Sequence, residues 1–100
     1  MVNAEDFLSE FLKLGLNHFT GVPDSTLKEW MTLLDNNQSA FENRIAANEG
    51  AAIAHATGYY LATKNVSVVY LQNSGLGNCI NPLTSLTDPE AYSIPLVMVM

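Results

Sequence analysis

The sequence predicts an α/β fold: a doubly wound parallel sheet with helices on both faces. Two observations predict it. Short apolar segments alternate with amphipathic helical patterns along the chain, as in folds built from strand–helix–strand units. Residues 66–71 form a β-branched run without polar alternation, which is typical of a central parallel strand that is buried on both faces.

A first helix is expected over residues 4–14. The side chain of Asn3 can cap its first turn, and Gly15 suits the position after its last turn. Its apolar residues recur at helical spacing and fall on one face: Phe7, Leu8, Phe11 and Leu12. A short strand is expected to follow over residues 16–20.

A second helix is expected after a turn at residues 21–23, with Asp24 or Ser25 as its cap. The residues expected on its inward face are Leu27, Trp30, Met31 and Leu34. A polar turn then leads to a second strand, predicted at residues 43–47.

A third helix is expected over residues 50–63, before the β-branched strand. The segment 72–77 is predicted to be a loop, and a fourth helix is predicted to begin late or to be interrupted at Pro82, because proline lacks a backbone N–H. An apolar strand over residues 94–100 completes a sheet of about four strands. A buried strand at this place normally continues into a covering helix, so we expect these residues to be a fragment or part of a larger protein.

The composition disfavours several classes of protein. Hydrophobic residues make up 48% and charged residues 14%, as in a folded domain. A net charge of −6 with only four Lys and Arg residues argues against binding to nucleic acids or to membrane surfaces. The acidic amino terminus does not resemble a signal peptide, no apolar run could span a bilayer, and a single cysteine, Cys79, fits a reducing compartment. The chain is therefore expected to be cytoplasmic.

An acidic residue, Glu49, stands where the second strand ends and a helix of small residues begins. Ligands of parallel α/β folds bind at such points, and a carboxylate there lies at the positive end of the helix dipole. On this pattern alone, Glu49 is most simply a first-turn glutamate that complements the dipole. The histidines His18 and His55 show no metal-ligand spacing with each other or with the cysteine, so they are expected to be structural or surface residues, and no metal site is predicted.

Two other segments also follow predicted strands. In residues 20–25, Gly21 permits close approach of the backbone and Pro23 fixes the turn, while Asp24 is as plausible an N-cap as a catalytic residue. Residues 73–78 read Asn-Ser-Gly-Leu-Gly-Asn and are expected to form a loop that faces a ligand, or simply a tight turn.

Together these segments resemble the thiamin-diphosphate-dependent decarboxylases. The resemblance rests on Glu49 with its small-residue helix to Gly58, on residues 20–25 and on residues 72–86, and it covers nearly the whole chain. It is strongest to the phosphonopyruvate decarboxylases. The α-type chain of sulfopyruvate decarboxylases and a non-catalytic α/β binding module are the alternatives.

The resemblance implies a domain arrangement. Residues 1–100 would be the amino-terminal part of the pyrimidine-binding domain of the enzyme. The diphosphate-binding domain, which would hold most of the ligands of Mg²⁺, has no counterpart in these residues. The chain alone is therefore expected to be inactive.

The implied reaction is that of a carbon–carbon lyase in phosphonate metabolism, which converts phosphonopyruvate to phosphonoacetaldehyde and CO₂. Glu49 matches the glutamate that hydrogen-bonds N1′ of the cofactor, and Asp24 matches an acidic residue near the reacting centre. The candidate cofactor-binding residues are Glu49, Gly21, Val22, Pro23, Asn73, Ser74, Gly75, Leu76 and Asn78. The candidate substrate-binding residues are Asp24, Ser25, Gln72 and Asn73.

The resemblance also implies a homo-oligomer whose active site lies between subunits. The helix after Glu49 gives a further reason to expect a close neighbour, because its small side chains leave room for one. The small residues are Ala51, Ala52, Ala54, Ala56 and Gly58. Larger contacts are expected from Ile53, Tyr59 and Tyr60.

Overall fold

One parallel sheet runs through the middle of the molecule. The computed structural model describes residues 2–100 and contains the strands β1 (His18–Gly21), β2 (Glu42–Ile45), β3 (Val68–Tyr70) and β4 (Val97–Val99). The strands lie in the order β2-β1-β3-β4, and all pairs are parallel. The predicted α/β class and the central position of the β-branched strand are confirmed.

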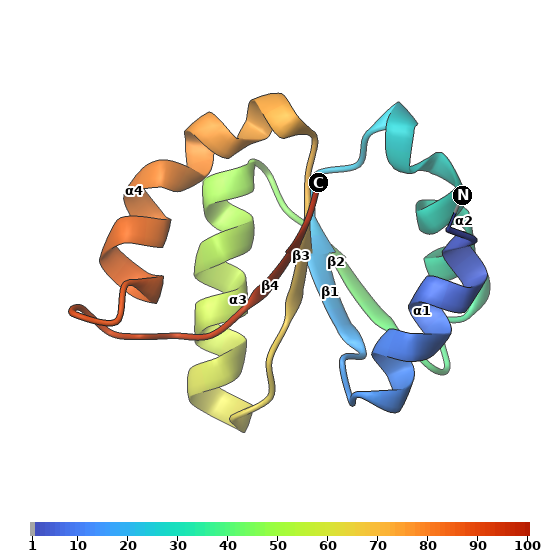
Figure 1. Cartoon of the computed structure of the whole chain (residues 1–100), viewed down its shortest axis with the longest axis horizontal. Helices are drawn as coiled ribbons and strands as arrows, with labels where there is room; N and C mark the ends of the chain where they lie inside the picture. The colour runs from blue at the N-terminus through green and yellow to red at the C-terminus, as the bar shows by residue number, and fades with distance from the viewer. Residues whose placement is uncertain (1) are drawn as a thin grey trace.

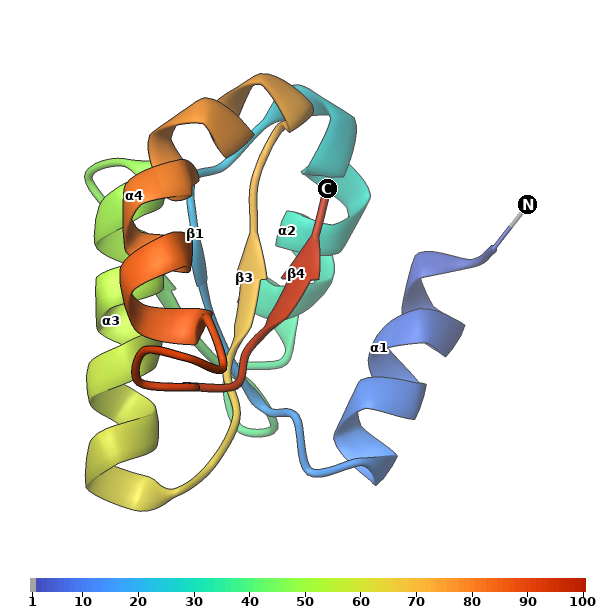
Figure 2. The ribbon, with the colours of Figure 1, turned by 60° about the vertical axis from the view of Figure 1, so that its left-hand side comes forward.

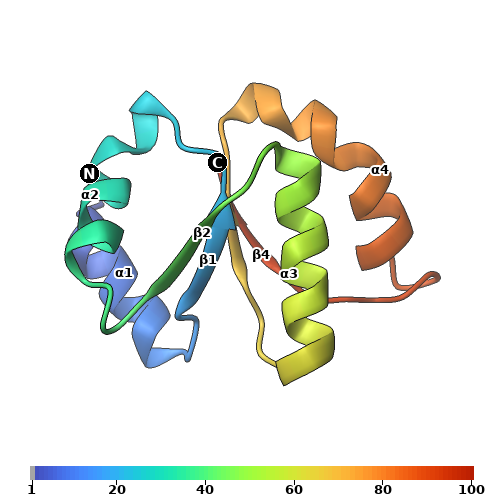
Figure 3. The same ribbon diagram turned by 180° about the vertical axis from the view of Figure 1, so that it is seen from behind.

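Helices cover both faces of this sheet (Figures 1 and 3). The helices α1 (Ala4–Lys13) and α2 (Lys28–Asn36) lie on one face. The helix α3 (Glu49–Thr63) and a helical segment after β3 lie on the other face. This segment consists of η2 (Asn73–Cys79), α4 (Ile80–Pro82) and η3 (Leu83–Thr87). The two-sided arrangement is the predicted one.

The core on the α1 and α2 face is aromatic. Trp30 is buried, and its ring meets Phe11 and Phe19 edge-on at centroid distances of 5.9 and 5.6 Å. Such edge-to-face pairs add to the stabilisation from buried area. The predicted inward face of α1 is too wide. Leu8 and Phe11 are buried, but Phe7 and Leu12 are 38% and 45% exposed.

The core on the other face is made mostly of small and aliphatic residues. Its members are Ala52, Ile53, Ala56, Val69, Leu71 and Cys79. The first three belong to α3 and are fully or almost fully buried against the sheet of the same chain. The prediction that Ala52, Ile53 and Ala56 contact a neighbouring subunit is therefore wrong, because these side chains are already covered.

The helix caps follow the sequence closely in most places. The side-chain oxygen of Asn3 accepts a hydrogen bond from the backbone N–H of Glu5 at 2.8 Å, as predicted for the start of α1. Asp24 caps a short 3₁₀ helix, η1 (Ser25–Leu27), and α2 begins only after it. The predicted cap is therefore real, but it belongs to η1 and not to the second α-helix.

The predicted loop over residues 72–77 is wrong, because the chain is helical from Asn73 onward. The segment starts as a 3₁₀ helix, in which the N–H of Gly75 donates to the carbonyl of Gln72 at 2.8 Å. Such turns need few residues and tolerate polar and glycine-rich sequences. Pro82 does not start this helix; it ends α4, and wider π-type turns follow over Leu83–Thr87, so the helical segment changes type at Pro82, as the predicted interruption implies.

Two histidines meet near the amino ends of β1 and β2. His18 is buried, and its Nε2 atom lies 2.9 Å from Nε2 of His55 on α3. Its Nδ1 atom lies 3.3 Å from a carboxylate oxygen of Glu42, and its ring stacks on Tyr59 at a centroid distance of 3.7 Å. His18 is therefore structural, as predicted, but the pairing of the two histidines was not predicted.

This cluster predicts that the protein becomes less stable in acid. Burial lowers the pKa of His18 below its ordinary value of 6.5; the Glu42 carboxylate opposes this shift, whereas His55 and Arg44 add to it. Because the pKa of His18 is lower in the folded chain, the unfolded chain binds the proton more tightly, and protonation favours unfolding. Above the unfolded pKa the histidine is neutral in both states and does not change the stability. The free energy of unfolding in urea should therefore decrease as the pH falls below about 6.5.

Two variants test the origin of this pH dependence. His18→Gln removes the titrating group and should flatten the pH dependence between about pH 6.5 and pH 5. Glu42→Gln removes the carboxylate that supports the protonated form of His18, so it should make the decrease steeper. An unchanged slope in His18→Gln would show that other groups cause the effect.

Candidate functional site

The three segments that the sequence singled out lie at one edge of the sheet. Figure 2 shows the turn after β1 and the start of η2 at the same end of the strands. Backbone hydrogen bonds join the strand ends: the N–H of Val22 donates to the carbonyl of Tyr70 at 3.2 Å, and the N–H of Ala46 donates to the carbonyl of Gly21 at 2.8 Å. This is the carboxyl edge of the sheet, where α/β folds bind their ligands.

The backbone of β3 passes very close to Gly21 at this edge of the sheet. A Cβ atom at this position would lie 2.0 Å from the carbonyl oxygen of Tyr70, which is far inside van der Waals contact. The sequence prediction that Gly21 permits close approach is confirmed, although the neighbour is the next strand. Val22 is half-buried beside it, and Pro23 is exposed.

Glu49 is the first residue of α3 and its side chain turns toward η2. Asn48 caps the helix by accepting the N–H of Ala51 at 2.8 Å, which fixes where α3 begins. One carboxylate oxygen of Glu49, Oε2, accepts a hydrogen bond from Nδ2 of Asn78 at 2.7 Å. This bond is the largest cause of a pKa below the ordinary value for Glu49, because it stabilises the charged form.

Two glycines allow α3 and η2 to lie this close. A Cβ atom at Gly75 would lie 2.4 Å from Oε1 of Glu49, and a Cβ atom at Gly50 would lie 2.9 Å from the carbonyl oxygen of Asn78. Gly75 was among the predicted site residues, whereas Gly50 was missed. Its position directly after the acidic residue was the signal that could have indicated it.

The other predicted residues of η2 divide into exposed and packed positions. Gln72, Asn73 and Ser74 are exposed at the end of β3, where their polar groups are accessible. Leu76 packs against the aliphatic core beneath α3. The structure therefore brings the exposed residues to the same edge as Glu49 and uses Leu76 to anchor the segment.

Asp24 is engaged as a cap. Its carboxylate accepts hydrogen bonds from the backbone N–H of Thr26 at 3.2 Å and from the hydroxyl of the same residue. The hydroxyl bond is the main reason that the pKa of Asp24 is lower than usual. The capping alternative is thus confirmed, and a catalytic role for Asp24 stays a prediction.

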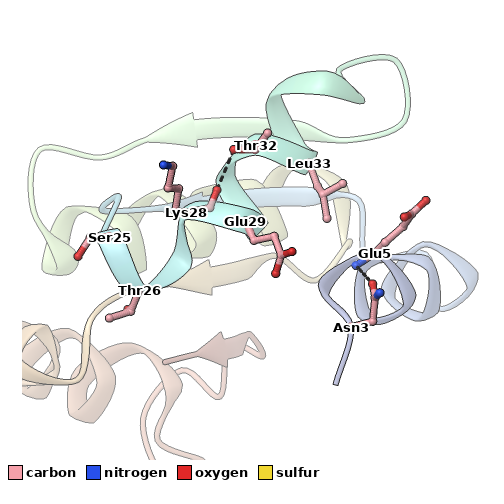
Figure 4. Close-up of a pocket in the computed structure, with 8 residues that line it drawn as sticks. All are labelled: Asn3, Glu5, Ser25, Thr26, Lys28, Glu29, Thr32 and Leu33. Carbon is pink, nitrogen blue, oxygen red and sulfur yellow. Dashed lines mark hydrogen bonds between the residues drawn. The ribbon is translucent and has the colours of Figure 1, made fainter. Parts of the chain in front are cut away.

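A groove of about 550 Å³ lies between the start of α1 and the η1–α2 segment (Figure 4). In the close-up, Asn3 and Glu5 of the α1 end lie across the groove from Glu29 and Leu33. Of the predicted site residues, Ser25 lines this groove and Glu49 does not. The groove is therefore separate from the contact between Glu49 and Asn78.

Two features are absent from the part of the chain that the structure describes. Among residues 2–100, no three His, Cys, Asp or Glu side chains are grouped so that they could hold a metal ion. No helix in the same part of the chain combines the length and apolar character needed to cross a membrane.

The fold and the carboxyl-edge site define a doubly wound α/β domain of the kind that holds its ligand at the ends of parallel strands. The chain belongs to the family described as thiamine pyrophosphate enzyme, N-terminal TPP binding domain, which matches residues 2–100. The resemblance found in the sequence is confirmed.

Two decarboxylases are similar to this chain along almost its whole length. The chain is 36% identical over 99 residues to a phosphonopyruvate decarboxylase of Streptomyces hygroscopicus, an alignment that covers 99% of this chain and 24% of that protein. It is 31% identical over 97 residues to the sulfopyruvate decarboxylase subunit alpha of Methanococcus maripaludis, covering 97% of this chain and 56% of the subunit. The chain therefore spans about a quarter of the first relative and about half of the second.

A solved structure has the same fold. It is an enzyme from Mycobacterium smegmatis assigned as thiamin diphosphate-dependent, with a TM-score of 0.75 and 27% sequence identity. The match covers 98% of this chain and 18% of that one. The fold described above thus matches one part of a much longer chain.

Proposed function

We propose that this chain is the amino-terminal part of the pyrimidine-binding domain of a thiamin-diphosphate-dependent decarboxylase that converts phosphonopyruvate to phosphonoacetaldehyde and CO₂. The observation that carries the proposal is Glu49, held at the carboxyl edge of the sheet by Asn78 at 2.7 Å. The family match and the 36% identity to a phosphonopyruvate decarboxylase support it. The proposed reaction belongs to phosphonate metabolism.

The residues around Glu49 fit the aminopyrimidine end of the cofactor. Oε2 is occupied by Asn78, while Oε1 faces Gly75, where the lack of a side chain leaves the carboxylate room. When bound, thiamin diphosphate supplies the electron sink for loss of CO₂. Glu49 would hold the proton at N1′ of the pyrimidine. The hydrogen bond from Asn78 lowers the pKa of Glu49, which favours the carboxylate form that such a role needs.

The remaining site residues are proposed to position the cofactor and the substrate. The turn Gly21, Val22 and Pro23 would place backbone groups near the cofactor, since Gly21 already allows the closest strand approach. The exposed side chains of Gln72, Asn73 and Ser25 are available to hydrogen-bond the 2-oxo acid. Asp24 would act near the reacting centre only if its bonds to Thr26 are exchanged for bonds to substrate.

The proposal includes parts outside these residues. A second, diphosphate-binding domain would hold Mg²⁺ and the anionic end of the cofactor, so the 100 residues alone would be inactive. The active site would lie between subunits of a homo-oligomer in the cytoplasm. The acidic net charge of −6 supports a small-molecule substrate and neither nucleic acid nor membrane as a partner.

Sulfopyruvate decarboxylation is the second candidate, favoured by two α-subunit relatives that are 31% identical to this chain. A non-catalytic binding module is less well supported. Glu49 is half-buried, and its carboxylate turns toward η2 and the other site residues, where it accepts the bond from Asn78.

Comparing the two substrates tests the proposal. The full-length protein, with thiamin diphosphate and Mg²⁺, should release CO₂ from phosphonopyruvate with a higher kcat/KM than from sulfopyruvate. Specificity is the ratio of these two constants, so both must be measured on the same preparation. A higher kcat/KM for sulfopyruvate would select the second candidate, and no reaction with either would favour the binding module.

A further inference from the structure

Two helical elements that are far apart in the sequence meet at Glu49. The residue begins α3, and Asn78 lies in the last turn of η2, 29 positions later. The bond from Nδ2 of Asn78 to Oε2 of Glu49 is short, at 2.7 Å. Hydrogen bonds with one charged partner are stronger than neutral ones, but at a protein surface they compete with water. The bond therefore needs a rigid frame in order to persist.

The frame is provided by the packing of η2 on α3. Gly50 leaves just enough space for the carbonyl of Asn78, and Gly75 leaves just enough space for the carboxylate of Glu49. Cys79, the neighbour of Asn78, is fully buried in the aliphatic core. The backbone at Asn78 and directly after it is thus held by packing, whereas the side chain of Asn78 is exposed and is held by its bond to Glu49.

The bond also makes the two carboxylate oxygens of Glu49 different from each other. Oε2 is occupied by Asn78, and Oε1 makes no hydrogen bond to another side chain within residues 2–100. A neutral amide fixes the carboxylate without pairing its charge, which a lysine or arginine would do. Oε1 lies against Gly75 of η2 and is not paired with a cation, so it keeps its charge and its direction is set by the same contact.

We propose that Asn78 is a positioning residue: it holds Oε2 of Glu49 so that Oε1 is presented to N1′ of the cofactor pyrimidine. The inference rests on the proposed function and adds to it, since Asn78 acts through Glu49 and not on the cofactor. A catalytic group that is displaced by about 1 Å can lose on the order of 10²-fold in rate, so such a residue has a measurable effect.

The test uses three variants of the full-length protein. Asn78→Ala removes the donor, and Asn78→Asp keeps the shape of the side chain while removing the donor and adding a charge. Asn81→Asp is the matched control, because Asn81 is exposed on the next helical turn and its side chain has no hydrogen-bond partner among the described residues. Both Asn78 variants should lower kcat by about 10–100-fold, with little change in KM for the cofactor, whereas the control should not.

A second readout needs neither cofactor nor activity. The ¹³C signal of the Glu49 carboxyl group, assigned by its loss in Glu49→Gln, is followed against pH in the apoprotein. Loss of the Asn78 bond should raise the pKa of Glu49, and Asn81→Asp should leave it unchanged. The acid side of the kcat profile should move in the same direction, and thermal unfolding should not change.

These readouts separate the possible failures. An unchanged Glu49 titration in both Asn78 variants overturns the positioning role, even if kcat falls, and a lower unfolding temperature would then identify Asn78 as structural. If the wild-type protein decarboxylates neither 2-oxo acid, the proposed function fails and the positioning role for N1′ fails with it. The titration still shows in that case whether the bond to Glu49 exists.

Discussion

Replacing Glu49 with glutamine should lower kcat of the full-length enzyme by about 10²–10⁴-fold, the usual cost of removing a positioned acid–base group. Glutamine has the same shape and can still accept the hydrogen bond from Asn78, so the contact between α3 and η2 should persist. What it loses is the charge that favours a proton on N1′. Steady-state decarboxylation of phosphonopyruvate at saturating cofactor measures the effect.

The affinity for the cofactor should change much less than kcat. The diphosphate and its metal ion carry the larger charges of the ligand, and they are proposed to bind outside these residues. Glu10→Gln is the matched control: it removes one negative charge from an exposed pair with Lys13 on α1, at 3.0 Å, and should leave both constants unchanged. Turnover of Glu49→Gln close to that of the wild type would rule out the proposed role of Glu49.

The sheet could be predicted because its strands leave strong local signals. Residues 66–71 are mostly β-branched and apolar. The strand β3 lies inside this range and pairs with β1 on one side and β4 on the other. The helical segment from Asn73 to Thr87 could not be predicted in the same way. Its 3₁₀ part contains Gly75 and Gly77, and Pro82 ends α4 before the π-type turns; glycine and proline usually indicate turns.

The site could be predicted as a set of segments but not as a set of contacts. Parallel strands end at the same edge, so the positions of Gly21, Glu49 and Asn73 followed from the expected fold. The bond between Glu49 and Asn78 depends on close approaches that only the folded chain creates. The same holds for His18 and His55, which are 37 positions apart in the sequence and meet at 2.9 Å.

The buried face of α3 could not be predicted, because small residues occur on both sides of this helix. Ala52 and Ala56 are buried against the sheet, whereas Ala51, Ala54 and Gly58 are exposed. A helix with alanine on opposite faces has no clear difference in hydrophobicity between them, so the pattern does not show which side is inward. The structure supplies this information and changes which substitutions test the proposed assembly.

Arginine at Ala56 should abolish folding, whereas arginine at Ala54 should leave the fold intact and abolish assembly. Ala56 is 1% exposed in the aliphatic core, and burying an unpaired charge there costs several kcal/mol, beside the steric cost of the larger side chain. A domain is stable by about 5–15 kcal/mol, so that loss is a large part of the total. Ala54 lies on the exposed face, where arginine disturbs no contact within the chain.

The two variants of this matched pair add the same charge two residues apart on one helix, so they separate folding from assembly. Circular dichroism should show a folded Ala54→Arg protein and an unfolded Ala56→Arg protein. If the exposed face of α3 meets a second subunit, the mass of Ala54→Arg measured by light scattering should fall to that of a monomer. Decarboxylation should be lost with it, because each active site is proposed to need two subunits. A fully active Ala54→Arg oligomer would place the subunit contact on another surface, and a fully active monomer would exclude a shared site.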